Sequence, residues 1–342
     1  MGLVEDLNEI KAIKDEIKQS ITNKGIDTNN KNFSEYPSLI DSISNKITLP
    51  ENLNISCNDY VDNKGLFYKG RNSESYDLLI PYIREIKNGE TFIQNWTSIT
   101  NEQIQKMKHL ILTGDNSGFF LNQGTRRSFT YPNFDTSKNL YFRNFFFGNT
   151  VTFNDVVDVS GCSSFGLQYM FNNCNIINNT SKKIPISDSL GDAGNMAYMF
   201  VNSNLEEFSG VDCSNLHGMQ STFLNCTKLK KFESNIKQGY FLNAFQNCPN
   251  LTSIKFTNDC LNIVSSSSPL DISTTGITTE ELLTQFIEDL PNNTDYNSAN
   301  GTSIKGYINV NETQFNLLGS LLSSSSLIFK AIMKGYTFSK VS

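Results

Sequence analysis

The chain has 342 residues, of which 38% are hydrophobic and 18% are charged, and its formal net charge is −6. This composition is typical of a globular protein long enough for roughly two or three structural units. An acidic chain has no overall electrostatic attraction for nucleic acid or anionic membranes, and no apolar run approaches the roughly 20 residues of a membrane helix. We therefore expect neither nucleic-acid binding nor membrane insertion. The first residues also lack the pattern of a secretory signal, so we expect a protein made in the cytoplasm.

Residues 1–45 begin with an amphipathic stripe. Its apolar positions follow alternating steps of four and three, the spacing of a short coiled-coil seam, with Lys14 tolerated at one core position. The seam positions are Leu3, Leu7, Ile10, Ile17 and Ile21. We predict a helical oligomerisation or attachment segment, then a turn at Gly25 and a second small helix through residues 36–43. The alternative is a helix that packs on its own domain. The heptad pattern does not fix the number of copies.

Residues 46–113 are predicted to form a connecting region that ends in a first, atypical coil. Most of this segment has a mixed strand and helix pattern with a break at Pro81. Towards its end, "TSITNEQIQKMKHLILTG" predicts a capped helix followed by a strand.

A repeated phrase, Phe-x-Asn-(Cys/Ser/Thr), dominates residues 114–264 and recurs five times at intervals of 24, 29, 23 and 22 residues. The copies begin at Phe147, Phe171, Phe200, Phe223 and Phe245, and their asparagines are Asn149, Asn173, Asn202, Asn225 and Asn247. An apolar residue precedes the phenylalanine at helical spacing, as Met196 precedes Phe200, and others follow at steps of three and two. Periods of about 20–29 residues, with a short strand and a helix or turn in each, predict a leucine-rich-repeat solenoid.

Each residue type in the repeat has an expected physical role. The phenylalanines would pack between adjacent coils, because no single coil can bury its own apolar face. The asparagines would bridge backbone groups of neighbouring turns that a tight corner leaves unpaired. Seven cysteines without a CxxC pair favour core packing over disulfides or zinc binding.

The segment "NMAYMFVNSNLEEFSGVDCSNLHGMQSTFLNCTKLKKF" resembles the BspA-like leucine-rich repeats, whose units follow roughly M-x-x-M-F-x-x-C-x-x-L-x-x-L/I. The match is good over about 165–258 and weaker over 107–164. Ser203 stands where the pattern has Cys, and a longer insert precedes the third of the five copies, the one at Phe200. The resemblance implies an α/β repeat solenoid.

Residues 265–342 are predicted to form a small α/β cap. The pattern is an N-capped amphipathic helix from Thr278 or Thr279, a strand, a mostly helical stretch ending at Gly335, and a final strand. This ending resembles the closing unit of repeat-bearing tail and fibre proteins from phages of gut bacteria, whose last segment commonly contains Lys-Gly-Trp/Tyr-Thr. Here Lys334 begins that phrase. A polar-faced cap would close the solenoid and block edge-to-edge aggregation.

Motifs of common enzyme classes are missing from the sequence: it has no phosphate-binding loop, HExxH or GxSxG pattern, and we place no carboxylate pair on one face. We therefore expect a non-enzymatic protein without a cofactor or metal. If the solenoid binds a ligand, tyrosines between the packing positions are the candidates: Tyr169, Tyr198, Tyr240 and Tyr307. The alternative is that each is simply half-buried.

The N-terminal segment contains "IKQSITNKG" at residues 17–25, followed by Phe33 and Tyr36. This pattern is similar to segments of virion proteins from phages infecting Bacteroides-like hosts. Together with the repeats and the cap, this resemblance implies a virion fibre or decoration protein. Its partners would be further copies of itself (a trimer, by analogy with fibres), other virion proteins, and a host surface protein or glycan. Two alternatives remain: a bacterial cell-surface adhesin with the same repeats, and a tailspike-type enzyme that degrades glycans.

Overall fold

The computed structural model describes residues 3–23, 55–56, 83–87, 100–106, 110–122, 124, 126–258, 261–263, 266–293, 306–319, 323 and 325–341. The chain divides into two compact units, Met1–Ile86 and Lys87–Ser342.

In the first unit, α1 spans Leu3–Asn23, so the helix predicted at the N-terminus is present. Within the predicted seam, Ile21 is fully buried and Ile17 is half-buried, whereas the other three side chains lie outside the described residues. The second helix predicted over residues 36–43 also lies outside them. β1 (Ile55–Ser56) pairs in parallel with β2 (Ile83–Lys87). The association of α1 with further copies of the chain stays a prediction.

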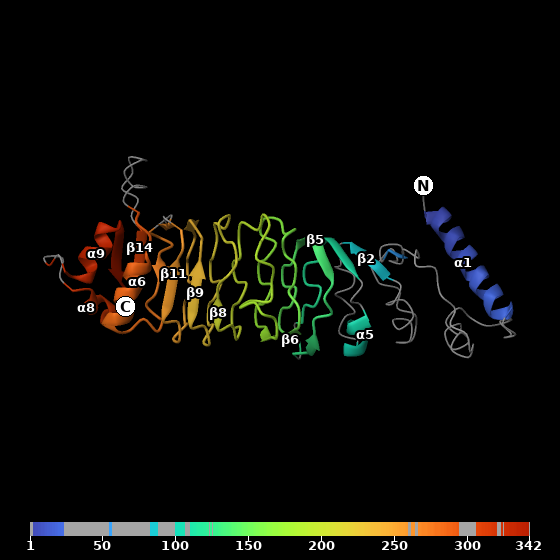
Figure 1. Ribbon diagram of the computed structural model, residues 1–342, viewed down its shortest axis with the longest axis horizontal. Coiled ribbons are helices and arrows are strands. Elements are labelled where there is room, and N and C mark those ends of the chain that lie inside the picture. Colours follow the sequence, from blue (N-terminus) through green and yellow to red (C-terminus); the bar gives the residue numbers. More distant parts are fainter. Residues whose placement is uncertain are drawn as a thin grey trace. The chain divides into compact units, whose positions relative to one another are not determined.

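The first helix and strand described within the second unit are α5 (Asn101–Lys106) and β3 (Ile111–Asp115), which are the helix and strand predicted there. A parallel β-solenoid of about six coils follows over residues 111–256, and Figure 1 shows the coils stacked in sequence order. Its parallel ladders are β3 with β5 (Asp135–Tyr141); β4 (Ser128–Thr130), β6 (Thr150–Phe153) and β7 (Asn175–Asn178); β8 (Glu207–Phe208), β9 (Lys231–Ser234) and β11 (Ser253–Phe256); and β10 (Gln238–Gly239) with β12 (Asn262–Ile263). The predicted repeat solenoid is therefore confirmed.

One type of corner, built around the repeat phenylalanine, recurs in five coils. The residues two before and two after this phenylalanine have positive φ, such as 60° at Tyr198 and 55° at Asn202 on either side of Phe200. The N–H groups of these three residues donate to carbonyls of the next coil at 2.9–3.0 Å. Left-handed residues turn the chain and interrupt a helix. The helical interpretation of the spacing between Met196 and Phe200 is therefore wrong: both are buried, but on a turn.

The corner phenylalanines form a column of stacked rings through the core. Neighbouring ring centroids are 5.4–5.8 Å apart and the planes lie within 16° of parallel through Phe120, Phe146, Phe171, Phe200, Phe223 and Phe245. Four of the five predicted core phenylalanines are members of this column. The prediction of Phe147 is wrong by one residue, because Phe146 occupies the column and Phe147 is only half-buried. Gly148, with φ 75°, supplies the left-handed residue that asparagine supplies in later coils.

The corner asparagines of the later coils form a ladder of amide hydrogen bonds along the solenoid. Each Nδ2 donates to the Oδ1 of the preceding coil, at 2.8 Å from Asn247 to Asn225 and at 2.9 Å from Asn225 to Asn202 and from Asn202 to Asn173. The predicted bridging of backbone groups is thus replaced by bonds between side chains. Each corner asparagine therefore has two roles: its backbone adopts the left-handed conformation, and its side chain joins the ladder.

A small, buried side chain fills the core directly after each corner. The Sγ of Cys226 donates to the carbonyl oxygen of Phe200 in the preceding coil, at 2.9 Å. Asn149 occupies the equivalent position and donates from Nδ2 to the carbonyl oxygen of Phe120 at 2.5 Å, so its predicted role as a corner asparagine is corrected. All five described cysteines are buried and free, which agrees with the predicted packing role: Cys162, Cys174, Cys213, Cys226 and Cys248.

The end of the chain forms an α/β unit in which the predicted helix, strand, helical stretch and strand follow in order, but a short strand that was not predicted, β13 (Leu270–Asp271), precedes them and the helical stretch is divided in two. The other elements are α6 (Glu280–Asp289), β14 (Gly306–Val310), α8 (Glu312–Leu318), α9 (Leu327–Met333) and β15 (Tyr336–Lys340). Thr279 is the N-cap of α6, and β14 lies between β13 and β15 in a parallel sheet. α6 packs against β11, the edge strand of the β8–β9–β11 ladder, and so covers that edge (Figure 1). Lys334 Nζ donates to three carbonyl oxygens at the end of α6, at 2.7–3.1 Å.

Candidate functional site

Two of the four tyrosines predicted as ligand contacts stack on each other at the corner of adjacent coils. The rings of Tyr169 and Tyr198 are parallel within 2° with centroids 4.8 Å apart, and the Tyr198 hydroxyl accepts a hydrogen bond from Gln220 Nε2 at 2.9 Å. Partial burial and the neighbouring tyrosine raise the pKa of Tyr169. Tyr240 lies two coils further along and is 40% exposed. Tyr307 is half-buried on β14, in the C-terminal sheet instead.

The backbone around these rings adopts a conformation that bulky residues rarely take. Eleven described residues other than glycine have positive φ: seven are asparagine, one is serine, and the remaining three are Phe165 (61°), Tyr169 (59°) and Tyr198 (60°). Asparagine tolerates this left-handed region, whereas a residue with a bulky side chain pays roughly 1–2 kcal/mol there. The backbone is therefore locally strained at Phe165, Tyr169 and Tyr198, the three aromatic residues at left-handed positions.

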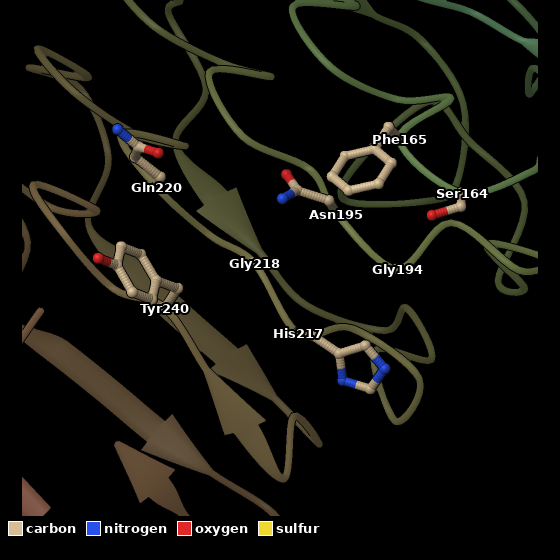
Figure 2. A pocket seen from close by; sticks show the side chains of 8 residues that line it. All are labelled: Ser164, Phe165, Gly194, Asn195, His217, Gly218, Gln220 and Tyr240. Carbon is tan, nitrogen blue, oxygen red and sulfur yellow. The ribbon is translucent and has the colours of Figure 1, made fainter. Parts of the chain in front are cut away.

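A hollow of about 190 Å³ lies beside the tyrosine pair. Its lining residues come from four successive coils: Ser164, Phe165, Gly194, Asn195, His217, Gly218, Gln220 and Tyr240. Figure 2 shows the rings of Phe165 and Tyr240 at opposite ends, with Asn195 between them. Gln220 links the hollow to the tyrosine pair through its hydrogen bond to Tyr198. The result is a small depression with an aromatic ring at each end and polar side chains between.

Glycines make the hollow, because they leave out side chains in the two middle coils. Gly194 and Gly218 lie along its floor (Figure 2). A Cβ atom at Gly218 would collide with the Nδ2 of Asn195, so only glycine lets that amide lie across the floor. The Oδ1 of Asn195 accepts a hydrogen bond from the N–H of Ala197 at 2.6 Å, which fixes the orientation of the amide.

The sequence prediction missed most of this site. Of the lining residues only Tyr240 was among the predicted contacts; Phe165, Asn195, His217 and Gln220 were not. Aligning the copies on the column phenylalanine places Phe165, Gly194 and His217 at one equivalent position, six residues before it. The alternation of an aromatic ring and a glycine at that position in successive coils was the signal by which the sequence could have indicated the hollow.

The buried thiols are poorly suited to act as nucleophiles. Burial raises the pKa of Cys162 and of Cys213 to about 12, and that of Cys226 to about 11. A thiol reacts as its thiolate, so a raised pKa and loss of solvent access both suppress its reactivity. These groups belong to the core.

The lining of the hollow combines aromatic rings with two amides, the hydroxyl of Ser164 and the imidazole of His217. Among its described lining residues there is no carboxylate, lysine or arginine. Across the described part of the chain, no cluster of three or more His, Cys, Asp or Glu side chains is arranged to hold a metal ion. Within the same residues, none of the helices has the length and apolar character needed to span a bilayer. The groups that this site offers to a ligand are ring faces, amides, one serine hydroxyl and one imidazole.

Fold and site together define a parallel β-solenoid with an aromatic hollow on its side. Comparison of the chain with protein-family models, with curated proteins and with solved structures found no match.

Proposed function

We propose that this chain is a non-enzymatic adhesive protein of a phage particle, a fibre or decoration component whose solenoid contacts the host surface. The observation that carries the proposal is the retention of three aromatic residues at strained, left-handed positions next to an open hollow. Backbone outliers of this kind cluster at functional sites. A stack of coils also suits adhesion, because it extends a binding face without needing a deep pocket.

We further propose that the repeats belong to the BspA-like leucine-rich class. The support is that the positions matching its consensus are buried in successive coils: Met196, Met199, Phe200, Leu205, Met219, Phe223, Cys226 and Leu229. The absence of helix from residues 126–256, all of which are described, places turns where many leucine-rich repeats have helices. The repeat class therefore rests on the consensus and its burial pattern.

The N-terminal segment is proposed to assemble copies of the chain and to attach them to other virion proteins. Multiple copies on one particle would raise weak contacts to useful strength through effective concentration. Light scattering on the full chain tests this proposal, with an expected mass about three times the 38.4 kDa of one chain. Replacing Leu7 and Ile10 by Asp should reduce the mass to that of one chain, whereas Lys11→Glu, an exposed position on the same helix, should not. A single-chain mass for the unaltered protein would contradict assembly through this segment.

The adhesive function is tested with fluorescently labelled full-length protein on cells. We expect saturable binding to gut Bacteroides strains and none to Gram-positive gut bacteria, and an antibody against the chain should label phage particles. Labelling of bacterial surfaces in uninfected cultures would favour the alternative of a bacterial adhesin. Release of reducing ends from host polysaccharide would favour a tailspike-type enzyme instead. The proposal fails if the protein binds no cells.

A further inference from the structure

We propose that the hollow between Phe165 and Tyr240, with the adjoining Tyr169–Tyr198 pair, binds a short stretch of a neutral glycan chain. This inference rests on the proposed adhesive function and names the ligand class of the same site. It follows from the exposed rings, the polar groups between them, the span of the hollow and the strain at its edge.

The two rings at the ends of the hollow offer apolar faces to solvent. Phe165 is 47% exposed and Tyr240 is 40% exposed; among the described residues, the one other exposed phenylalanine or tyrosine is Phe315 on α8, at 37%. A pyranose ring has one face of C–H groups, which packs on an aromatic face and leaves its hydroxyls at the rim. Rings of this kind supply large contact area at low entropic cost, and a tyrosine adds a hydroxyl.

The groups between the rings match sugar hydroxyls. An amide presents both donors and an acceptor, as a pair of hydroxyl groups does, and the hollow contains the amides of Asn195 and Gln220. Both amides are held in place: Asn195 accepts from the N–H of Ala197, and Gln220 donates to the hydroxyl of Tyr198. Groups fixed before binding lose little freedom when a ligand arrives, which favours affinity.

The span of the hollow indicates an oligosaccharide rather than a single sugar. Phe165 and Tyr240 belong to coils three steps apart, and at the strand spacing of roughly 4.8 Å their backbones are separated by about 14 Å. A chain of sugar rings lying along the solenoid axis would meet one aromatic ring at each end and the amides in between. The lining contains no lysine or arginine, and His217 is its one basic side chain, so a chain with a carboxylate on every sugar would find few partners there, which favours a neutral chain over an acidic one.

Backbone strain supplies an independent argument that the aromatic residues at the hollow's edge serve binding. At the position of Tyr169 and Tyr198 other coils have Asn144, Ser221 and Asn243, which satisfy the same left-handed corner. The fold alone therefore does not require tyrosine at this position. An observed backbone outlier beside a site is a recognised pointer to function.

The test uses the full chain, with neutral hexasaccharides of glucose, mannose and galactose as probes and a hexamer of galacturonic acid as the acidic comparator. Saturation-transfer NMR and calorimetry should detect binding of at least one neutral probe at millimolar concentration, at least tenfold tighter than that of the acidic one. The variants Phe165→Asn, Tyr198→Asn and Tyr240→Ser should each weaken that binding at least tenfold. The matched control Tyr307→Ser, a tyrosine in the C-terminal sheet, should leave it unchanged.

Folding is separated from binding by the choice of residue. Asparagine tolerates the left-handed backbone, so Phe165→Asn should keep or raise the melting temperature while binding is lost. The inference is overturned if no neutral probe binds, if the acidic hexamer binds equally well, or if the three variants bind as the unaltered chain does. If cells are still bound while these variants have no effect, the site assignment fails and the adhesive function stands. If neutral probes bind through these residues but no cells are bound, the glycan site stands and the adhesive function fails.

Discussion

At the left-handed corner residue Asn225, we predict that substitution by glycine destabilises the protein less than substitution by alanine. This order is the reverse of the usual one in helices and strands. Asn225 has φ 61°, donates to Asn202 and accepts from Asn247 in the amide ladder. Replacing it by Gly or by Ala removes both hydrogen bonds. Only Ala, however, must place a Cβ atom in the left-handed region. The two variants therefore share the loss of the ladder and differ in backbone strain.

The magnitudes follow from those two terms. Two solvent-exposed hydrogen bonds at the low end of the usual range contribute about 1 kcal/mol together. The left-handed backbone costs Ala roughly 1–2 kcal/mol, offset by the greater freedom that Gly has in the unfolded chain. We expect Asn225→Gly to lower the free energy of unfolding by about 1 kcal/mol and Asn225→Ala by about 2 kcal/mol. Glycine should thus be the better substitute.

Urea denaturation followed by circular dichroism measures both variants in the full chain. The control pair is Lys255→Ala and Lys255→Gly, at an exposed position in the middle of β11 where φ is negative. There Ala should be more stable than Gly by about 0.5–1 kcal/mol. The reasoning is refuted if Gly is also the worse substitute at Asn225, because the left-handed corner would then contribute no strain.

Three further perturbations address the core and the cap. Phe223 is fully buried, with its ring stacked between those of Phe200 and Phe245, so Phe223→Ala should cost about 4 kcal/mol in urea denaturation; a cost below about 1 kcal/mol would contradict a packed ring column. Burial raises the pKa of Cys226 to about 11, so the folded state favours the neutral thiol. The stabilisation that comes from this shift is fully present below about pH 8.5, the pKa of a cysteine thiol in the unfolded chain, and it is lost as the pH rises towards 11. Relative to Cys226→Ser, which keeps a donor, the unaltered chain should lose about 1.4 kcal/mol of stability per pH unit in that window, and parallel pH profiles would count against the shift. Lys334→Met removes a charged donor from the carbonyls that end α6 and should cost about 2 kcal/mol, with faster amide exchange in the last turn of α6; unchanged exchange there would show that the contact is dispensable.

Much of the fold was predictable because the same residue types recur at equivalent positions of each coil. Phenylalanines at nearly regular intervals can only be buried together by stacking coils, and the C-terminal unit has clear caps and periodicity. The register of the second coil was not predictable from the motif. Its run of three phenylalanines, residues 145–147, allows three alignments. Matching Asn149 to the asparagine of the repeat selected Phe147, one residue after the phenylalanine that is in the column. Only the backbone conformation shows that Gly148, and not Asn149, is the corner residue.

The aromatic hollow was harder to predict because its lining residues come from four different coils. Gly194 and Gly218 mean little within their own repeats, and they become a floor only when the neighbouring coils place Phe165 and Tyr240 at either end. The left-handed backbone of Tyr169 and Tyr198 likewise cannot be inferred from tyrosine, which seldom adopts it. Periodicity predicts the stack, whereas sites on its surface depend on where the copies differ.

The hydrogen bonds of the corners have a mechanical consequence. They join each coil to the next, so a pull between the two ends of the solenoid loads them along their own direction and breaks one coil boundary at a time. Each coil released contains 22–29 residues from phenylalanine to phenylalanine and would lengthen the chain by roughly 75–100 Å. In the proposed adhesive role, a solenoid built this way would yield in steps under shear, and the coils still folded would stay bound to the host surface while the released chain extends.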